Sequence, residues 1–546
     1  MNSLKPMLLT SLKSYDRTQF VKDVTAGIIV AIIALPLSIA LALASGVGPE
    51  AGIFTAIVAG FVISALGGSS VQIAGPTAAF ATIVAGIVAK DGLDGLVIST
   101  ILAGIFLILM GLCHFGSLIK FIPYTITTGF TSGIAVTIVI GQLKDFFGVT
   151  YPDGVKPIET TEKFKAFIEN ISTMNTAALI VGIVSLAILI ISPVIFKKIP
   201  GSLIAVIVGI LMVQFLPLKV STIGNLYTIS NSLPSFHMPA IRFSTISASV
   251  SNAFTIAVLA AIESLLSCVV ADGMINSKHR SDMELVAQGA GNIASALFGG
   301  IPATGAIART AANIKNGGRT PIAGMVHSVT LIIVLVVLMP YAGMIPMPTI
   351  AAILFIVAYN MCQWRTFRDL VKTAPKSDIL VLIVTFVLTV IFDLVVAIEI
   401  GMVLACLLFI KRMSEETHAD SWVYTDDDTP DIDEHLQKLP LQIRVYEITG
   451  PLFFGAADAI EHIVVKDFTR CLVLRMRGVP ALDSTAMNAL QNLVKTCESK
   501  GITLVFSHVN EQPMHVMEKA GFVELVGKEN FQSNISAALK RAEEVI

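Results

Sequence analysis

The sequence predicts a multi-span α-helical membrane protein of about 14 spans, built as a 7+7 inverted repeat and followed by a small α/β domain. The first observation is composition: 54% of the residues are hydrophobic and 14% are charged, whereas soluble chains carry about 25% charged residues. The second is a pair of apolar stretches that Gly and Pro interrupt at corresponding places in two halves. The third is a polar C-terminal end in which strand-like runs alternate with helical patterns.

The apolar segments give the spans and their orientation. Segments of about 20 residues, enough to cross a bilayer, run from Val24 to Phe409. With the N-terminal segment 1–22 in the cytoplasm, an even number of spans keeps both termini there and places the basic loops inside. The expected spans are 23–44, 51–66, 71–90, 95–113, 123–142, 176–193, 201–217, 249–271, 283–298, 301–315, 321–339, 346–361, 378–393 and 396–411. They form a transmembrane domain, 23–412, with repeats over about 23–217 and 249–412. The inner basic residues are Lys120, Lys197, Lys198, Lys278, Arg280, Lys315, Arg319, Arg365, Arg368, Lys372, Lys376, Lys411 and Arg412.

Two spans, the third and the tenth, are interrupted in the same way. Gly67–Lys90 and Gly299–Lys315 each contain a Gly-Gly pair, a few extended residues, a break at Gly or Pro, and a short helix of small side chains. A helix from Gly305 to Lys315 would be about 16 Å long, roughly half of a ~30 Å hydrocarbon core. Non-helical backbone at membrane depth is tolerated where protein or a water-filled cavity satisfies it. Paired interruptions of this kind indicate the substrate site of a transporter.

The interrupted segments predict an anion site without requiring a cationic side chain. A half-helix whose N-terminus points at the bilayer midplane presents unpaired N–H groups and the positive end of its dipole. Two such ends facing each other would hold an anion. The alternative is that Gly and Pro merely kink a spanning helix against a neighbour. The candidate binding residues are Gly75, Pro76, Thr77 and Ala78 on one side and Thr304, Gly305 and Ala306 on the other.

Two ionisable residues stand inside apolar spans, where a charge is costly and indicates function. Arg309 follows Gly305 by one helical turn and would favour a dianion or a carboxylate. Glu263 lies in the eighth span, with Ser267 one turn further on the same face. A carboxyl group removed from water holds its proton more readily, which suits a proton carrier. Glu263 could equally bind a cation such as sodium, or form a structural ion pair with Arg309.

Several function classes find no support in the sequence. The six cysteines are scattered without metal-ligand spacing, so we expect no metal, no disulfide framework and no cofactor. The net charge of −2 and the absence of a basic patch with aromatic residues argue against nucleic acid. No apolar segment with a cleavage site precedes the first span, so we expect no signal peptide. No nucleophile–base arrangement is present, and we expect no catalytic residues.

After the last span the chain changes character. Residues 413–440 are rich in acids and predict a solvated linker. Residues 441–546 alternate strand-like runs with helical patterns and predict a cytoplasmic α/β layer fold. Asp483 is placed to cap the helix that follows, and Ser484 would stand in its first turn, either as a regulatory site or as part of the cap.

These motifs carry a family resemblance. The phrase GVPALDSTAMNALQNLV (478–494) resembles the STAS fold, in which a serine at this place can be phosphorylated in the anti-sigma-factor antagonists. The phrases ALPLSIALALASGVGPEAGIFTAIVAG (34–60), VQIAGPTAAF (71–80) and GAIARTAANIKNGGRTPIAG (305–324) resemble the SulP anion permeases, whose animal relatives include pendrin and prestin.

The resemblance implies the fourteen-span inverted-repeat fold of uracil permeases, split into a core and a gate domain. It also implies a pocket at Thr77, Gly305 and Ala306, with Arg309 facing the anion and Glu263 and Ser267 as coupling-ion residues. In similar sodium–bicarbonate members an aspartate stands at the Glu263 position and the arginine is missing. The glutamate and the GAIAR pattern here are instead similar to bacterial proton-coupled members, including dicarboxylate carriers.

We therefore expect a secondary active anion transporter, a proton-coupled symporter of sulfate, a related inorganic anion or a small dicarboxylate. A sodium-coupled bicarbonate symporter and an uncoupled exchanger or channel are the alternatives. A nucleobase carrier is disfavoured, because the tenth span has no second acid to bind an amide edge. We further expect a homodimer in a bacterial inner membrane and a cytoplasmic partner for the STAS domain.

Overall fold

The structure is a computed structural model that describes residues 3–117, 122–152, 154–155, 157–195, 200–216, 218–239, 243–392, 394–422, 439–461, 463 and 468–546. The chain forms two compact units, Met1–Met402 and Val403–Ile546. The predicted inner residues Lys120, Lys197 and Lys198 lie outside the described residues, as do positions 423–438 of the predicted linker.

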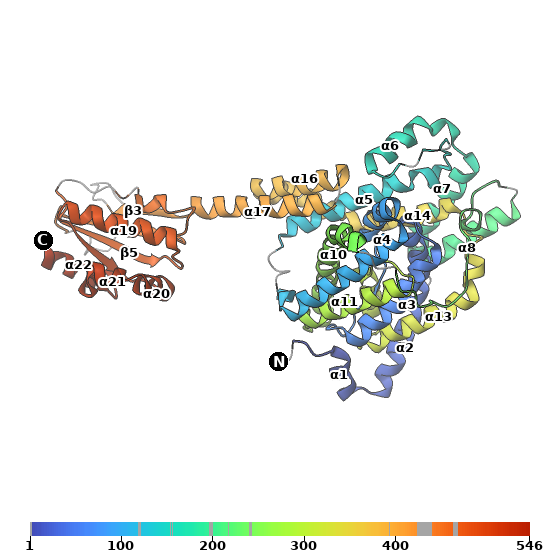
Figure 1. The fold of residues 1–546 in the computed structure, drawn as a ribbon, viewed down its shortest axis with the longest axis horizontal. Coiled ribbons are helices and arrows are strands. Elements are labelled where there is room, and N and C mark those ends of the chain that lie inside the picture. Colours follow the sequence, from blue (N-terminus) through green and yellow to red (C-terminus); the bar gives the residue numbers. More distant parts are fainter. Residues whose placement is uncertain are drawn as a thin grey trace. The chain divides into compact units, whose positions relative to one another are not determined.

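The first unit is helical (Figure 1). Within the described residues, eight helices are long and apolar enough to cross a membrane by length and composition. The count of fourteen spans and the inverted repeat stay predictions. The helices, with the last one continuing into the second unit, are α1 (Met7–Ser11), α2 (Arg17–Ala44), α3 (Pro49–Leu66), α4 (Ala78–Leu112), α5 (Tyr124–Phe147), α6 (Thr160–Glu169), α7 (Thr176–Ile195), α8 (Gly201–Phe215), α9 (Ile223–Leu226), α10 (Phe243–Ile275), α11 (Ser281–Leu297), α12 (Ile307–Lys315), α13 (Ile322–Ala342), α14 (Met347–Cys362), α15 (Trp364–Thr373), α16 (Lys376–Ile391) and α17 (Leu394–Glu415).

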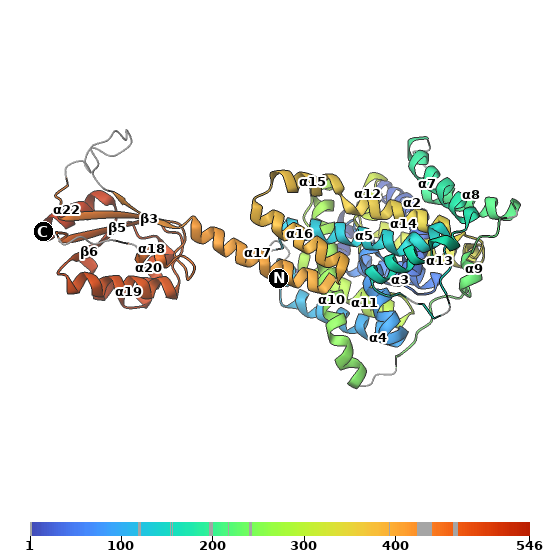
Figure 2. The same cartoon turned by 90° about the horizontal axis from the view of Figure 1, so that it is seen from above.

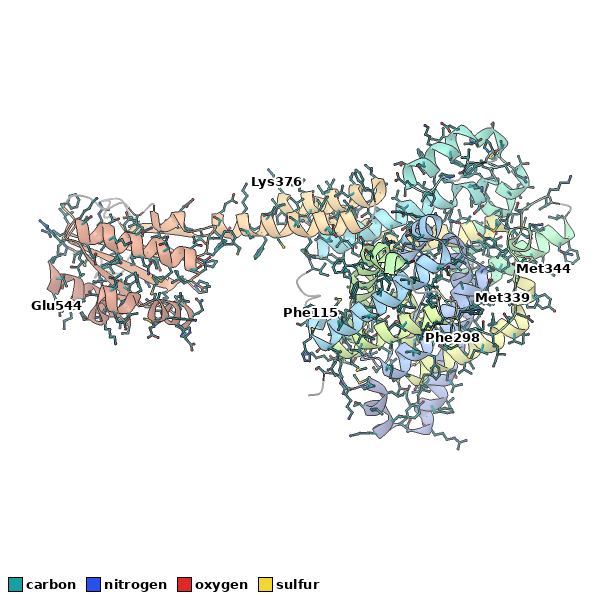
Figure 3. The ribbon with its side chains drawn as sticks, viewed as in Figure 1. Phe115, Phe298, Met339, Met344, Lys376 and Glu544 are labelled. Atoms are coloured by element: carbon teal, nitrogen blue, oxygen red, sulfur yellow. The ribbon has the colours of Figure 1, made fainter. Side chains whose placement is uncertain are left out.

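The helices of this unit pack in two groups. In one, α4 packs on α10 and α11, and α2, α3 and α13 pack on one another. In the other, α5 packs on α14 and α16, and α7 packs on α8 and α14. Large apolar side chains such as Phe215 and Ile333 are more than half exposed, which suits helices that face lipid. Figure 3 shows the side chains on the ribbon.

Helix α4 joins two of the predicted spans, 71–90 and 95–113. Gly92 breaks its helical path with φ 73° and ψ −172°, a backbone conformation that glycine adopts without a steric penalty. This break falls within the predicted gap between the two spans, 91–94, and the first interrupted segment passes through it as a kink into the next helix.

Two short strands replace helix at the interruptions. β1 (Ala74–Gly75) pairs antiparallel with β2 (Thr304–Gly305), with Ala74 opposite Gly305 and Gly75 opposite Thr304. The pairing continues one residue further, because the Ala306 N–H donates to the Ile73 carbonyl at 2.9 Å. Backbone polar groups that leave a helix at membrane depth thus find partners in the other interrupted segment.

A buried carboxylate, Glu284 of α11, fixes the chain that leads into β1. It is fully buried and accepts hydrogen bonds from the backbone N–H groups of Gly68 and Ser69 at 2.9 and 3.1 Å. The side-chain amide of Gln72 donates to its other oxygen at 2.7 Å. A Cβ at Gly68 would lie 2.0 Å from the Arg280 carbonyl oxygen, so glycine at this position is required by close packing on the start of α11.

A second buried carboxylate, Asp23 of α2, holds the chain that leaves α12. It accepts the Arg319 N–H at 2.9 Å and the Thr320 hydroxyl at 2.6 Å. The N-terminal segment is also docked on this unit, since Arg280 donates to the Lys5 carbonyl at 2.8 Å. A buried acid from a neighbouring helix therefore holds the chain where it enters the first interrupted segment and where it leaves the second.

The second unit contains a five-stranded sheet in the order β3-β4-β5-β6-β7, in which β3 is antiparallel to β4 and the other neighbours are parallel. One apolar cluster lies under α19 and the helices near it, and another under α22, so helices cover both faces (Figure 2). The elements are β3 (His418–Trp422), β4 (Ile443–Thr449), α18 (Asp458–Glu461), β5 (Cys471–Gly478), α19 (Ser484–Ser499), β6 (Thr503–Ser507), α20 (Glu511–Lys519), α21 (Phe522–Val526), β7 (Phe531–Gln532) and α22 (Ile535–Val545).

The predicted linker 413–440 is too long at its start. Residues up to Glu415 continue α17, and His418–Trp422 forms the edge strand β3, which pairs with β4 from His418 opposite Thr449 onward. The strand was not predicted because its stretch is polar and acidic. Charged side chains are also common on exposed edge strands.

We predict that Glu284→Ala destabilises the transmembrane unit by about 2 kcal/mol, because it leaves the buried N–H groups of Gly68 and Ser69 without an acceptor. Thermal unfolding in detergent measures the change. Glu169→Ala is the control, since the Glu169 side chain is 61% exposed and its ion pair with Lys165 is 3.9 Å long. Equal unfolding temperatures for the two variants would contradict the anchoring role of Glu284.

Candidate functional site

The paired strands bring the starts of α4 and α12 to one place. Thr77 follows β1 and is the N-cap residue of α4, and Ala306 follows β2 and is the N-cap residue of α12. The first N–H groups of each helix have no partner inside that helix and carry its positive dipole end. Ile307 and Ala308, in the first turn of α12, are exposed at this place. The structure therefore places both predicted half-helix ends at one site.

The Arg309 side chain packs against β1 and the residue that follows it, Pro76. The side chain is 2% exposed, and its Nη2 donates to the Pro76 carbonyl. Its Nε and Nη1 have no hydrogen-bond partner. A Cβ at Gly75 would lie 2.5 Å from Nη1, so glycine at this position lets the guanidinium lie against the strand. A buried guanidinium with unused donors is suited to bind an anion.

Glu263 of α10 contacts the next residue, Thr77. The Thr77 hydroxyl donates to its Oε2 at 2.9 Å, and both side chains are half-buried. Glu263 and Arg309 do not form the structural ion pair that the sequence left open, because no hydrogen bond or ion pair joins them. Two consecutive residues, Pro76 and Thr77, thus bind one charged side chain each.

Other predicted binding residues use their polar groups in hydrogen bonds within the protein. The Thr304 hydroxyl is fully buried and donates to the Ala260 carbonyl at 3.0 Å. The N–H of Ala306 belongs to the strand pairing. A Cβ at Gly305 would lie 2.4 Å from Nε2 of Gln72, so this glycine makes room for a buried side chain. Both donors have partners within the fold, and a part of Thr304, Gly305 and Ala306 in anion binding through other atoms stays a prediction.

Ser267 is not joined to Glu263 by a hydrogen bond. Its hydroxyl lies 3.5 Å from the Thr310 hydroxyl, which in turn accepts the Ile73 N–H at 3.0 Å. Ser267 is 1% exposed and contributes to the packing of α10 on α12. A direct part in binding a coupling ion stays a prediction for this residue.

His327 of α13 was not among the residues predicted from the sequence. The ring is fully buried, and neither of its nitrogens has a hydrogen-bond partner. A lone histidine inside an apolar segment is the signal that could have found it. Glu284 and Asp23 were also missed, because they stand near span ends, where acids are common.

The C-terminal unit contains the regulatory candidate. Asp483 caps α19, accepting the Ala486 N–H at 2.9 Å, as the sequence predicted, and it also accepts the Phe454 N–H at 2.8 Å. Ser484 is exposed in the first turn of α19. Because the N-terminus of a helix attracts negative charge, a phosphate on Ser484 would be accommodated there.

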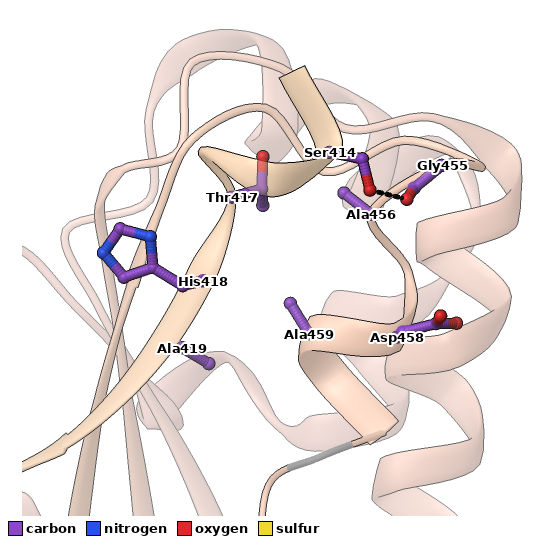
Figure 4. A pocket seen from close by; sticks show the side chains of 8 residues that line it. All are labelled: Ser414, Thr417, His418, Ala419, Gly455, Ala456, Asp458 and Ala459. Carbon is purple, nitrogen blue, oxygen red and sulfur yellow. Dashed lines mark hydrogen bonds between the residues drawn. The ribbon is translucent and has the colours of Figure 1, made fainter. Parts of the chain in front are cut away.

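A cavity of about 310 Å³ lies in the same unit (Figure 4). The Ser414 hydroxyl donates to the Gly455 carbonyl across its rim, and the Thr417 hydroxyl donates to the Met413 carbonyl at 2.9 Å. Most of its lining side chains are small. The lining residues are Ser414, Thr417, His418, Ala419, Gly455, Ala456, Asp458 and Ala459.

Comparison with known families decides the assignment. Residues 20–385 match the sulfate permease family, and residues 438–538 match the STAS domain. The chain belongs to the sulfate permease family. It is a multi-pass membrane transporter of anions and not an enzyme, with a C-terminal STAS domain, and the predicted family is confirmed.

Two curated relatives extend over nearly the whole chain. The putative sulfate transporter YvdB of Bacillus subtilis is 38% identical over 528 residues, which cover 95% of this chain and 97% of the relative. The bicarbonate transporter BicA of a Picosynechococcus species is 31% identical over 538 residues, covering 95% and 94%.

Solved structures support the fold. The transmembrane domain of a cyanobacterial BicA has a TM-score of 0.62 at 28% identity and covers 72% of this chain and 98% of that one. The murine anion transporter Slc26a9 has a TM-score of 0.89 at 19% identity and covers 99% and 94%. The helical membrane fold with a C-terminal STAS domain is therefore confirmed.

We predict that Gly75→Ala weakens anion binding about tenfold, or about 1.4 kcal/mol, because the new methyl group displaces the Arg309 guanidinium. The dissociation constants of radiolabelled sulfate and bicarbonate measure the effect. Gly86→Ala is the matched control in α4, since its Cβ would meet nothing within 4 Å. An unchanged affinity in a folded Gly75→Ala protein would show that Arg309 does not act from behind β1.

Proposed function

We propose that this chain is a secondary active transporter that carries sulfate, a related inorganic anion or a small dicarboxylate together with a proton. The observation that carries the proposal is the adjacency of Pro76 and Thr77, which bind Arg309 and Glu263 separately. These two consecutive residues therefore link the Arg309 guanidinium, which has no acidic partner, to the Glu263 carboxyl group, which has no basic partner, among the described residues.

The anion end of the site is built from two kinds of positive charge. The helix N-termini at Thr77 and Ala306 supply dipoles and backbone donors, and residues Ile307 and Ala308 in the first turn of α12 are exposed. Arg309 adds a full charge and two unused nitrogens. This sum favours a doubly charged tetrahedral anion or a carboxylate, because a fork of N–H groups binds two oxygens at once.

The proton end is Glu263. The acid has no cationic partner among the described residues, and the Thr77 hydroxyl donates to it. A carboxylate without a positive partner in a partly buried site gains from taking up a proton. Arg309 lies behind the adjacent peptide and its charge would oppose a sodium ion there, so we place proton coupling before sodium coupling.

The relatives support either kind of anion. A bicarbonate transporter is among them, so a sodium-coupled bicarbonate symporter is the second candidate, and an uncoupled exchanger would use the same pocket. We further propose that both termini lie in the cytoplasm, that the protein is a homodimer, and that the STAS domain regulates transport rather than binding the anion.

We predict that Glu263→Gln abolishes gradient-driven uptake but leaves anion exchange measurable, because the amide keeps the hydrogen bond of Thr77 and cannot carry a proton. Proteoliposomes with imposed pH or sodium gradients and radiolabelled sulfate, bicarbonate, succinate or fumarate provide the measurement. Wild-type uptake that follows sodium and ignores pH would refute proton coupling. An unchanged pH dependence in the variant would remove Glu263 from the mechanism.

We predict that truncation after Glu415, which removes the whole sheet including β3, leaves the dissociation constant of the anion within about twofold and changes turnover, because no residue of the pocket is lost. Binding and transport are measured in the same vesicles. Ser484→Glu should likewise change turnover alone, and Ser499→Glu at the other end of α19 is its control. A folded truncated protein that no longer binds anion would mean that the STAS domain contributes to the site.

A further inference from the structure

The ten-residue helix α15 differs from its neighbours. It connects α14 to α16, and none of its residues is buried. Gln363 separates it from α14 with a left-handed backbone, φ 43°, and Pro375 stands at the start of α16. Its sequence, WRTFRDLVKT, holds three basic residues, whereas α14 and α16 are apolar on either side. The helix is therefore a separate element between two membrane helices.

The side chains of α15 form two neighbouring stripes. At about 100° per residue, Trp364, Phe367 and Val371 share one face, and Arg365, Arg368 and Lys372 share the adjoining face. Phe367 turns towards the protein and lies 5.4 Å from the ring of Phe386 in α16. Trp364 and Val371 remain 42% and 39% exposed at the edge of the apolar stripe. A basic stripe beside an exposed apolar edge is typical of a helix in a membrane interface.

Trp364 organises the basic stripe. The guanidinium carbons of Arg365 and Arg368 lie 5.7 and 5.2 Å from its ring centroid, within cation–π range. Its indole N–H donates to the Tyr359 hydroxyl at 3.3 Å, which ties the ring to the end of α14. Arg368 also forms an exposed ion pair with Asp369 at 3.1 Å, while Arg365 and Lys372 carry no ion pair among the described residues. The two guanidinium groups are thus held together on one aromatic ring.

The neighbouring helices fix the level of α15 in the membrane. Three basic residues and one acid in ten positions make it too polar for the hydrocarbon core. Both of its ends are tied within a few residues to apolar helices, and Lys376 begins the second of these (Figure 3). The helix therefore lies at a bilayer surface, where tryptophan is favoured.

We propose that α15 binds the headgroups of anionic phospholipids in the bilayer that holds the transmembrane unit. Trp364 and Val371 enter the interface, and Arg365, Arg368 and Lys372 contact the phosphate groups. Arginine suits this role because its planar fork binds two phosphate oxygens. The proposal is independent of which anion is transported.

The two tryptophans of the chain allow a direct test. The Trp422→Phe variant of the full chain leaves Trp364 as the only indole. Its fluorescence is measured in nanodiscs of one fixed mixture of phosphatidylcholine and phosphatidylglycerol. Bromine atoms, which quench indole on contact, are carried either by the phosphatidylglycerol or by an equal amount of the phosphatidylcholine. Arg365→Gln/Arg368→Gln is the test variant, and Lys163→Gln/Lys165→Gln on α6 is the matched control.

We expect brominated phosphatidylglycerol to quench Trp364 about twofold more strongly than brominated phosphatidylcholine, because basic residues enrich anionic lipid around them. The arginine variant and high salt should abolish this difference, and the lysine variant should keep it. Equal quenching by the two lipids, or no quenching, would overturn the proposal. An identical spectral change on adding inorganic phosphate to discs of phosphatidylcholine alone would also overturn it, because the site would then be one for free phosphate.

Discussion

The antiparallel pairing of Ala74–Gly75 with Thr304–Gly305 is the interaction on which the site depends. Two segments that are far apart in the sequence leave the helical conformation at the same place. The paired residues are buried, so their backbone polar groups need partners within the protein, and each segment supplies them to the other. The side chains of Asn313 and Thr310 complete this pairing by bonding to the Val71 carbonyl and the Ile73 N–H.

The strand pairing determines which helix ends and side chains lie next to each other. It places the N-termini of α4 and α12 together, and it brings Arg309 of one segment against Pro76 of the other. Thr77 is then directed at Glu263 of α10. The site is therefore a property of the contact between two segments, and a change at Glu284 or Asp23 would act on it by loosening their outer ends.

The sequence was informative where a pattern is local. Gly, Pro and small residues predicted the interruptions, the apolar runs predicted the helices, and Asp483 was correctly placed as a helix cap. The hydrogen-bond partners of individual groups could not be predicted, because they depend on how distant segments are aligned in the folded protein. The strand pairing took the Ala306 N–H, Ala260 took the Thr304 hydroxyl, and Gln72 filled the space at Gly305. Charges were misleading at residues 413–422, where α17 ends and an edge strand begins.

The central claim is that the transported anion binds beside Thr77, between the two helix N-termini. Thr77→Cys, in a protein whose six native cysteines have been replaced, tests it by the rate at which a charged thiosulfonate reagent modifies the new thiol. Thr77 is half-buried, so the thiol is within reach of the reagent. We predict that the transported anion slows this modification in proportion to its occupancy, and that Arg309→Ala removes the protection. Modification at the same rate with and without a saturating anion would contradict anion binding beside Thr77.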